Sequence, residues 1–99
     1  MIHIKAPKLL GMISPTISGL CVFNLLLYRD ELNPTLINHE EIHWEQYKEL
    51  FLIGFLFLYF YYHFKVGYRQ NPFEQEAYAN EHDLEYNKKR KPYAWKAYR

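Results

Sequence analysis

Residues 37–46 read INHEEIHWEQ and contain the pattern H-E-x-x-H at positions 39–43. On a helix, side chains four positions apart lie on one side, so His39 and His43 can point at the same ion. Two neutral imidazoles at this spacing can bind zinc. Glu40 follows His39 directly and can accept a proton from a water that the ion acidifies. The stretch also fits an exposed acidic helix face, and a third ligand would distinguish the two interpretations.

A second acidic segment, NPFEQEAYANEHD (residues 71–83), offers that third ligand. On a helix, Glu74 and Glu76 lie about 200° apart around the axis, so only one of them can face the ion. Glu74 is the preferred ligand and Glu76 is the alternative. Glu74 also has a purely structural explanation, because it stands three positions after Asn71, at the spacing of a capping box.

Together, INHEEIHWEQ and NPFEQEAYANE resemble the gluzincin zinc metallopeptidases, and the short chain resembles the one-domain minigluzincins. The resemblance spans roughly residues 15–90. It implies a peptidase that acts on peptide or protein substrates, with His39, His43 and Glu74 as ligands of Zn²⁺ and Glu40 as general base.

Gluzincins often carry the third ligand in an E-x-x-A-D motif, whose Asp braces a ligand histidine. In this sequence Tyr78 stands at the position of that Asp. A shifted match that begins at Glu76 would make Asn80 the bracing residue. Tyr78 and His82 are the candidates for stabilising an oxyanion in the transition state.

The sequence predicts one α+β domain over residues 1–99, with a small N-terminal β-sheet followed by a mostly helical core. MIHIK at the N-terminus and the apolar residues 16–29 are the predicted strands. An extended substrate could pair with the edge of residues 16–29. Two helices are predicted to begin at Pro34 and Pro72, each preceded by an Asn as N-cap.

The first of these helices would run from Pro34 to Val66, and the second from Pro72 to about Lys89. An unbroken first helix would place His39 about 40 Å from Val66, far from Glu74. The metal site therefore requires a chain reversal between residues 50 and 58. Gly54 is the only residue there without a Cβ, so it is predicted to make the turn with a positive φ.

The apolar run at residues 50–64 contains one ionisable group, His63. As a helix it would span about 22 Å, short of the 30 Å or so of a hydrocarbon core, so it is predicted to be buried within the protein. Peripheral membrane contact is the alternative. The single cysteine, Cys21, excludes an internal disulfide, which fits a cytoplasmic protein.

Two other functions remain open at this point. One is a non-catalytic protein that zinc stabilises, or a membrane-peripheral adaptor. The other is a nucleic-acid binder that uses the C-terminal residues 87–99, which carry six of the twelve basic residues. These residues are predicted to be a solvated end with a few aromatic side chains folded onto the body, and no nucleic-acid partner is expected. The sequence gives no indication of the oligomeric state.

Overall fold

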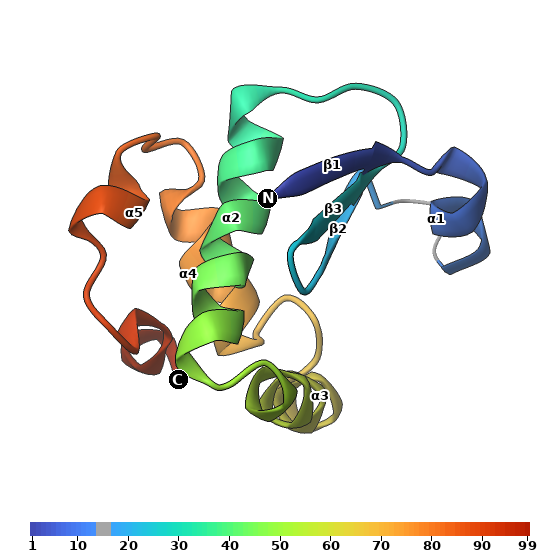
Figure 1. Cartoon of the computed structure of the whole chain (residues 1–99). Coiled ribbons are helices and arrows are strands. Elements are labelled where there is room, and N and C mark those ends of the chain that lie inside the picture. Colours follow the sequence, from blue (N-terminus) through green and yellow to red (C-terminus); the bar gives the residue numbers. More distant parts are fainter. Residues whose placement is uncertain (14–16) are drawn as a thin grey trace.

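The computed structural model describes residues 1–13 and 17–99 and has the predicted α+β architecture, a small N-terminal sheet followed by helices (Figure 1). In chain order the elements are β1 (Ile2–Lys5), α1 (Pro7–Ile13), β2 (Gly19–Val22), β3 (Leu25–Tyr28), α2 (Pro34–Glu49), α3 (Ile53–Val66), α4 (Pro72–Asn80), α5 (Tyr86–Lys89) and the 3₁₀ helix η1 (Ala94–Tyr98). Helix α1 is the one element among these that the sequence analysis missed.

The sheet has the order β1-β3-β2, with β1 parallel and β2 antiparallel to β3. The predicted strand region 16–29 is therefore a hairpin rather than one strand, because the chain turns at Phe23, whose φ is 52°. Thr16, where that region was predicted to begin, lies outside the described residues. Strand β2 forms one edge of the sheet and packs against α2, which also contacts α3 and α4.

Helix α2 begins as predicted. Pro34 is its first residue, and the side chain of Asn33 accepts a hydrogen bond from the amide of Leu36 at 2.8 Å. Helix α4 begins in the same way, with Pro72 first and the Asn71 side chain accepting from the amide of Phe73. In both cases an Asn side chain satisfies an amide that the first turn of a helix leaves without a partner.

The predicted chain reversal is present, since α2 and α3 are bent by 115° at a short break. The prediction that Gly54 makes the turn is wrong. The positive φ angles belong to Phe51 and Leu52, at 57° and 64°, whereas Gly54 lies inside α3. The amide of Leu52 donates to the carbonyl of Tyr47, and that of Phe51 to the carbonyl of Lys48. These are the bonds of a Schellman cap, which requires the left-handed conformation at Phe51, one position after Leu50.

The prediction that the apolar run is buried is also wrong. Within α3 only Phe55 is buried, while Phe57 and Phe64 are 74% and 83% exposed. One side of α3, with Phe55, Tyr59 and Tyr62, packs against the core, and the opposite side has no protein partner in the described residues. In the part of the chain that is described, no single helix is long and apolar enough to cross a membrane, although the bent pair α2–α3 passes that test as a pair.

The C-terminal region has an aromatic side chain folded onto the body as predicted, since Trp95 is buried, but a basic side chain, Arg90, is also buried there. Helix α4 ends at Asn80, well before the predicted Lys89, because the side-chain amide of Asn38 donates to the carbonyls of Asn80, Glu81 and Asp83. Arg90 is buried and pairs with Glu49 and Glu76. Within the hydrophobic core, one cluster of buried side chains consists of Cys21, Tyr47, Phe55, Phe73 and Trp95.

Candidate metal centre

The three predicted ligands meet at one point between α2 and α4. Nε2 of His39 lies 3.2 Å and Nε2 of His43 lies 3.0 Å from the same oxygen, Oε1 of Glu74. All three residues are buried, and one donor atom from each lies within 4.8 Å of the others. This group could therefore hold a metal ion, and two imidazoles with one carboxylate form a donor set that suits zinc.

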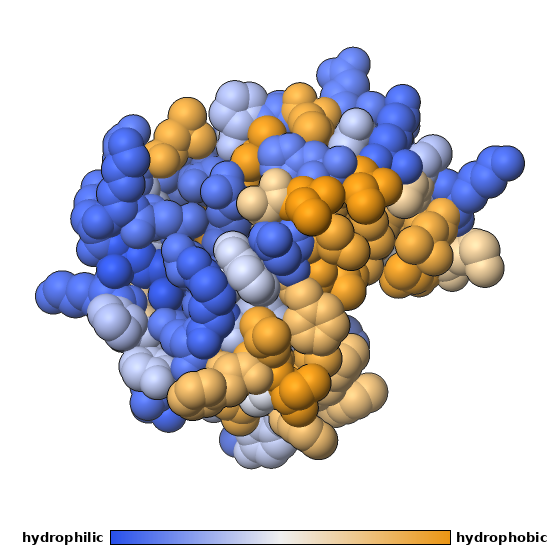
Figure 2. All heavy atoms as spheres, in the orientation of Figure 1, coloured by the Kyte–Doolittle hydropathy of each residue, from blue (hydrophilic) through white to orange (hydrophobic). Residues whose placement is uncertain are grey.

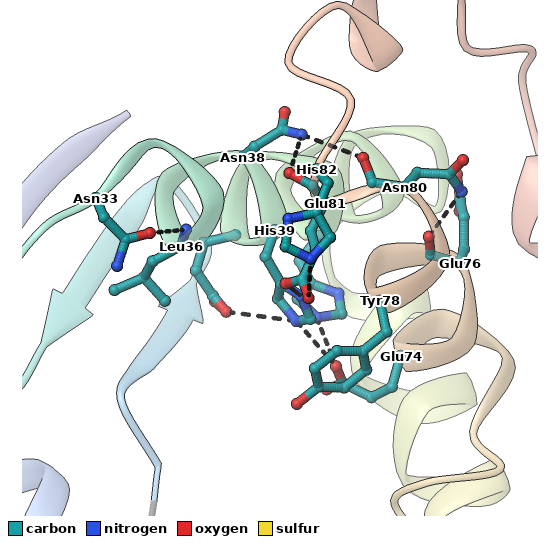
Figure 3. Close-up of polar contacts among 12 residues, drawn as sticks. Asn33, Leu36, Asn38, His39, Glu74, Glu76, Tyr78, Asn80, Glu81 and His82 are labelled. Atoms are coloured by element: carbon teal, nitrogen blue, oxygen red, sulfur yellow. Dashed lines mark hydrogen bonds and ion pairs between the residues drawn. The ribbon is translucent and has the colours of Figure 1, made fainter.

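The far nitrogens of both histidines are also engaged. Nδ1 of His39 lies 3.0 Å from a carboxylate oxygen of Glu81, and Nδ1 of His43 lies 2.8 Å from the side-chain oxygen of Gln46 (Figure 3 shows the Glu81 contact). Both partner atoms are acceptors, so each Nδ1 carries the hydrogen and donates it. Each Nε2 then faces Glu74: it donates to the carboxylate when it carries a proton, and it offers a lone pair to an ion once that proton has left.

Glu74 is oriented from a third helix. The hydroxyl of Tyr59, on α3, donates to Oε2 of Glu74 at 2.6 Å, which leaves Oε1 directed at the histidines. Burial raises the pKa of Glu74, but the charge of His43 and the hydrogen bonds from both histidines outweigh burial and hold this pKa far below its usual range. Burial also lowers the pKa of His43, and the carboxylate of Glu74 reverses this and raises it to about 9. Glu74 therefore stays ionised, as a ligand must be.

Glu40 stands beside the ligands with one oxygen unused. Its Oε1 lies 4.0 Å from Nε2 of His39, and its Oε2 is buried without a hydrogen-bond partner among the described residues. Burial is the main reason why the pKa of Glu40 is raised, although the two histidines oppose that effect. A buried carboxylate oxygen without a partner costs free energy unless a ligand or water meets it.

Glu76 does not reach this point, so the alternative third ligand is excluded. Its carboxylate is fully buried on another side of α4, where it accepts from Nε of Arg90 at 2.5 Å and from Gln46 at 2.9 Å (Figure 3). Asn80, the bracing residue of the shifted match, bonds instead to the carbonyl of Glu76 and to the hydroxyl of Tyr98.

Two cavities open on either side of Glu40. The polar one has a volume of about 460 Å³, and its lining includes His39, Tyr68, Arg69, Tyr78 and Glu81. The apolar one, of about 270 Å³, lies between β2 and α3 and is lined by side chains such as Val22, Phe23, Leu56 and Phe60. Glu40 and Gly19 line both cavities, so together they form a groove that follows strand β2 past the candidate metal centre.

The open edge of β2 faces this groove. The carbonyl of Ser18 accepts from the amide of Arg29 on the neighbouring strand. Because the pattern of an antiparallel pair alternates, the backbone groups of Gly19 and Cys21 point the other way, to the open edge. The carbonyl of Cys21 already accepts from the hydroxyl of Tyr47 there, which confirms its direction.

The two candidates for oxyanion stabilisation lie in different environments. The ring of Tyr78 contacts that of His39, with centroids 4.5 Å apart, and its hydroxyl is 2.8 Å from the hydroxyl of Tyr68. The side chain of His82 is 80% exposed and lines neither cavity. Of the two, only Tyr78 is positioned beside the candidate metal centre.

The sequence analysis did not predict the four residues whose side chains hydrogen-bond to the ligands and to Tyr78. These are Gln46, Tyr59, Tyr68 and Glu81. Two of them had a signal in the spacing. Gln46 is three positions after His43, and Glu81 is seven positions after Glu74, so each lies near the same helix side as the ligand. Tyr59 and Tyr68 had no such signal, because their positions depend on how α3 packs.

No significant match emerged when the chain was compared with known protein families, with curated proteins and with solved structures. The similarity to gluzincins therefore rests on the two motifs, and the case for a function rests on how the side chains are arranged.

Proposed function

We propose that this chain is a zinc-dependent peptidase in which His39, His43 and Glu74 hold the ion and Glu40 is the general base. The observation that supports this most directly is the buried, unpartnered Oε2 of Glu40 beside the three donors. A carboxylate held in that position, without being a ligand itself, is what proton transfer next to a metal requires.

When bound, zinc would make a water molecule more acidic and withdraw electron density from a substrate carbonyl. Glu40 would accept the proton of the attacking water and then pass it to the leaving amine nitrogen. Burial raises the pKa of Glu40, so its carboxyl group can hold a proton between these two steps. Tyr78, hydrogen-bonded to Tyr68 on the polar side, would donate to the oxyanion that forms.

The open edge of β2 would align the substrate. Gly19 and Cys21 direct backbone groups into the groove, so an extended peptide can pair with β2 as an added strand. Such a peptide would pass Glu40, which lines both cavities. Its side chain on one side of the scissile bond would enter the apolar cavity beside Phe23 and Leu56.

A zinc ion that only stabilises the fold is the alternative. Structural zinc sites usually have four protein ligands and no open position, whereas catalytic sites have three and leave one open. Among the described residues the donor group has three members, and a groove opens beside it. This arrangement favours the catalytic site.

The test is cleavage of a diverse peptide mixture by the zinc-reconstituted protein, with mass spectrometry of the new termini. We expect Glu40→Gln to retain one zinc per chain and to lose cleavage by at least about 100-fold. Glu41→Gln, at the next position of α2, is the matched control and should cleave normally. A wild-type chain that binds zinc but cuts no peptide would favour the zinc-stabilised alternative, and a chain that binds no zinc would overturn both.

A further inference from the structure

The exposed side of α3 is an apolar surface without a partner among the described residues. We define the apolar face of α3 as Ile53, Phe57, Phe60, Tyr61 and Phe64, each at least 52% exposed. At 100° per residue these five side chains lie within a stripe about 100° wide, opposite the side that packs against the core. Figure 2 shows apolar side chains gathered over α3 and, separately, over β1 and α1.

The segments that carry the exposed apolar side chains contain no acidic residue. The eleven acidic residues of the chain lie within residues 30–49 and 74–85, so residues 1–29 and 50–73 contain none. These two acid-free segments form β1, α1, the hairpin and α3, and they carry five basic residues, which are Lys5, Lys8, Arg29, Lys65 and Arg69. The charges that α3 and its flanking residues 50–73 contribute are therefore basic.

We propose that the apolar face of α3 docks on the surface of an anionic lipid bilayer. Aromatic side chains are favoured at the boundary between headgroups and acyl chains, and four of the five residues of the face are aromatic. Lys65 stands at the edge of the face, where its long side chain can reach lipid phosphates. Helix α3 has 14 residues and is about 21 Å long, too short to cross a bilayer, so it lies in the plane of the surface.

The charge pattern favours lipid over a second copy of this chain. Two copies that met through α3 would bring their Lys65 side chains together on helices that carry no acidic residue to pair with them, and like charges repel. An anionic surface is complementary to the same residues. Helix α1 gives a second contact, because Leu9, Met12 and Ile13 are exposed next to Lys8.

The docked surface adjoins the candidate site. Phe60 belongs to the apolar face and also lines the apolar cavity, together with Leu56. Docking through α3 would therefore place the mouth of that cavity beside the lipid. The docking itself does not depend on whether the chain cleaves peptides.

The test is co-sedimentation of the whole chain with vesicles, either of phosphatidylcholine alone or of equal parts of phosphatidylcholine and phosphatidylglycerol. We expect binding to the anionic vesicles and much weaker binding to the neutral ones. Phe57→Gln combined with Phe64→Gln should weaken binding by at least about tenfold. Leu84→Gln removes an apolar side chain that is 55% exposed within an acidic segment, and should bind like the wild type.

A second variant covers the case in which the double variant does not fold, as judged by its circular dichroism. Lys65→Glu changes only the charge at the edge of the face and should weaken binding to the anionic vesicles. The proposal is overturned if the wild type binds neither kind of vesicle, or if Lys65→Glu and the folded double variant bind as well as the wild type. It is also overturned if, in sedimentation without lipid, the wild type is a dimer and the double variant is a monomer.

Discussion

Glu81 accepts a hydrogen bond from Nδ1 of His39 at 3.0 Å, although Glu81 stands one position beyond the end of α4. In the gluzincin pattern the bracing acid comes four positions after the ligand, where this chain has Tyr78. Here the same hydrogen bond is made from seven positions after Glu74, because Asn38 binds the carbonyls at the end of α4 and keeps that turn next to His39.

Glu81→Ala should weaken zinc binding by about 10- to 100-fold, because His39 would lose the acceptor that fixes its tautomer and ring orientation. Competition with a chromophoric chelator measures this affinity. Glu85→Ala is the matched control, since it removes an exposed acid whose one ion pair among the described residues is with Lys88, and it should leave the affinity unchanged. Equal affinities of the two variants would contradict the bracing role.

Zinc affinity should fall as the pH is lowered. The pKa of His43 is raised to about 9 in the ion-free site, so at neutral pH an ion must displace a proton from its imidazole. Below pH 9 we expect the release of about one proton per zinc and a roughly tenfold loss of affinity per pH unit. Calorimetry in buffers with different ionisation enthalpies measures the protons released. Binding without proton release would show that His43 carries no extra proton in the ion-free site, against the raised pKa.

Gly54→Ala should stabilise the fold by about 0.5 kcal/mol, because Gly54 has no positive φ and lies in the first turn of α3. A Cβ added there would lie 3.6 Å from Cβ of Leu50, an ordinary contact. Phe51→Gly makes a useful comparison, since Phe51 is 87% exposed and holds the left-handed position. It should also be stabilising or neutral. Urea unfolding measures both, and a clear loss of stability in Gly54→Ala would contradict this geometry.

Glu76→Gln should destabilise the fold by about 3 kcal/mol, because it leaves the buried side chain of Arg90 with Glu49 as its one charged partner within residues 1–13 and 17–99. Burial raises the pKa of Glu76, but hydrogen bonds from Arg90, Gln46 and Tyr86 outweigh it and hold this pKa below its ordinary value of 4.5. A lowered pKa stabilises the folded state above about pH 4.5, and this stabilisation is lost as the pH falls below that value.

Urea unfolding at neutral pH and at about pH 4 tests both parts of this prediction. The wild type should lose more stability on acidification than Glu76→Gln does. Glu85→Gln again provides the control, because its ion pair with Lys88 is exposed and should contribute less than about 1 kcal/mol. An equal effect of the two substitutions would show that the buried pair contributes little.

The sequence was sufficient to predict which side chains meet at the site. The i, i+4 spacing placed His39 and His43 on one side of a helix, and the angle between Glu74 and Glu76 required a choice between them. Because Glu74 must reach both histidines, a chain reversal after residue 50 was also predicted. The first two predictions depend on local helix geometry, whereas the preference for Glu74 came from the resemblance to the gluzincin motif and the chain reversal from the need for a third ligand.

The errors concern the local cap that ends α2 and two features that depend on contacts between distant residues. The turn lies at Phe51 rather than Gly54, because a Schellman cap places the left-handed residue directly after the end of α2, whatever its side chain. Helix α4 ends at Asn80 because Asn38, 42 positions earlier, binds its last carbonyls. The exposure of Phe57 and Phe64 likewise depends on how α3 packs, which the apolar composition alone did not reveal.

His39 and Glu74 lie 35 positions apart, with the whole of α3 between them. Bringing them together closes a long loop, and the entropy of that closure must be overcome before an ion held by His39 and His43 gains its third ligand. The ligands can therefore assemble only late in folding, after α2, α3 and α4 have docked. An ion that binds so late should leave the folding rate almost unchanged and lower the unfolding rate. Its effect would then be seen in the lifetime of the native state.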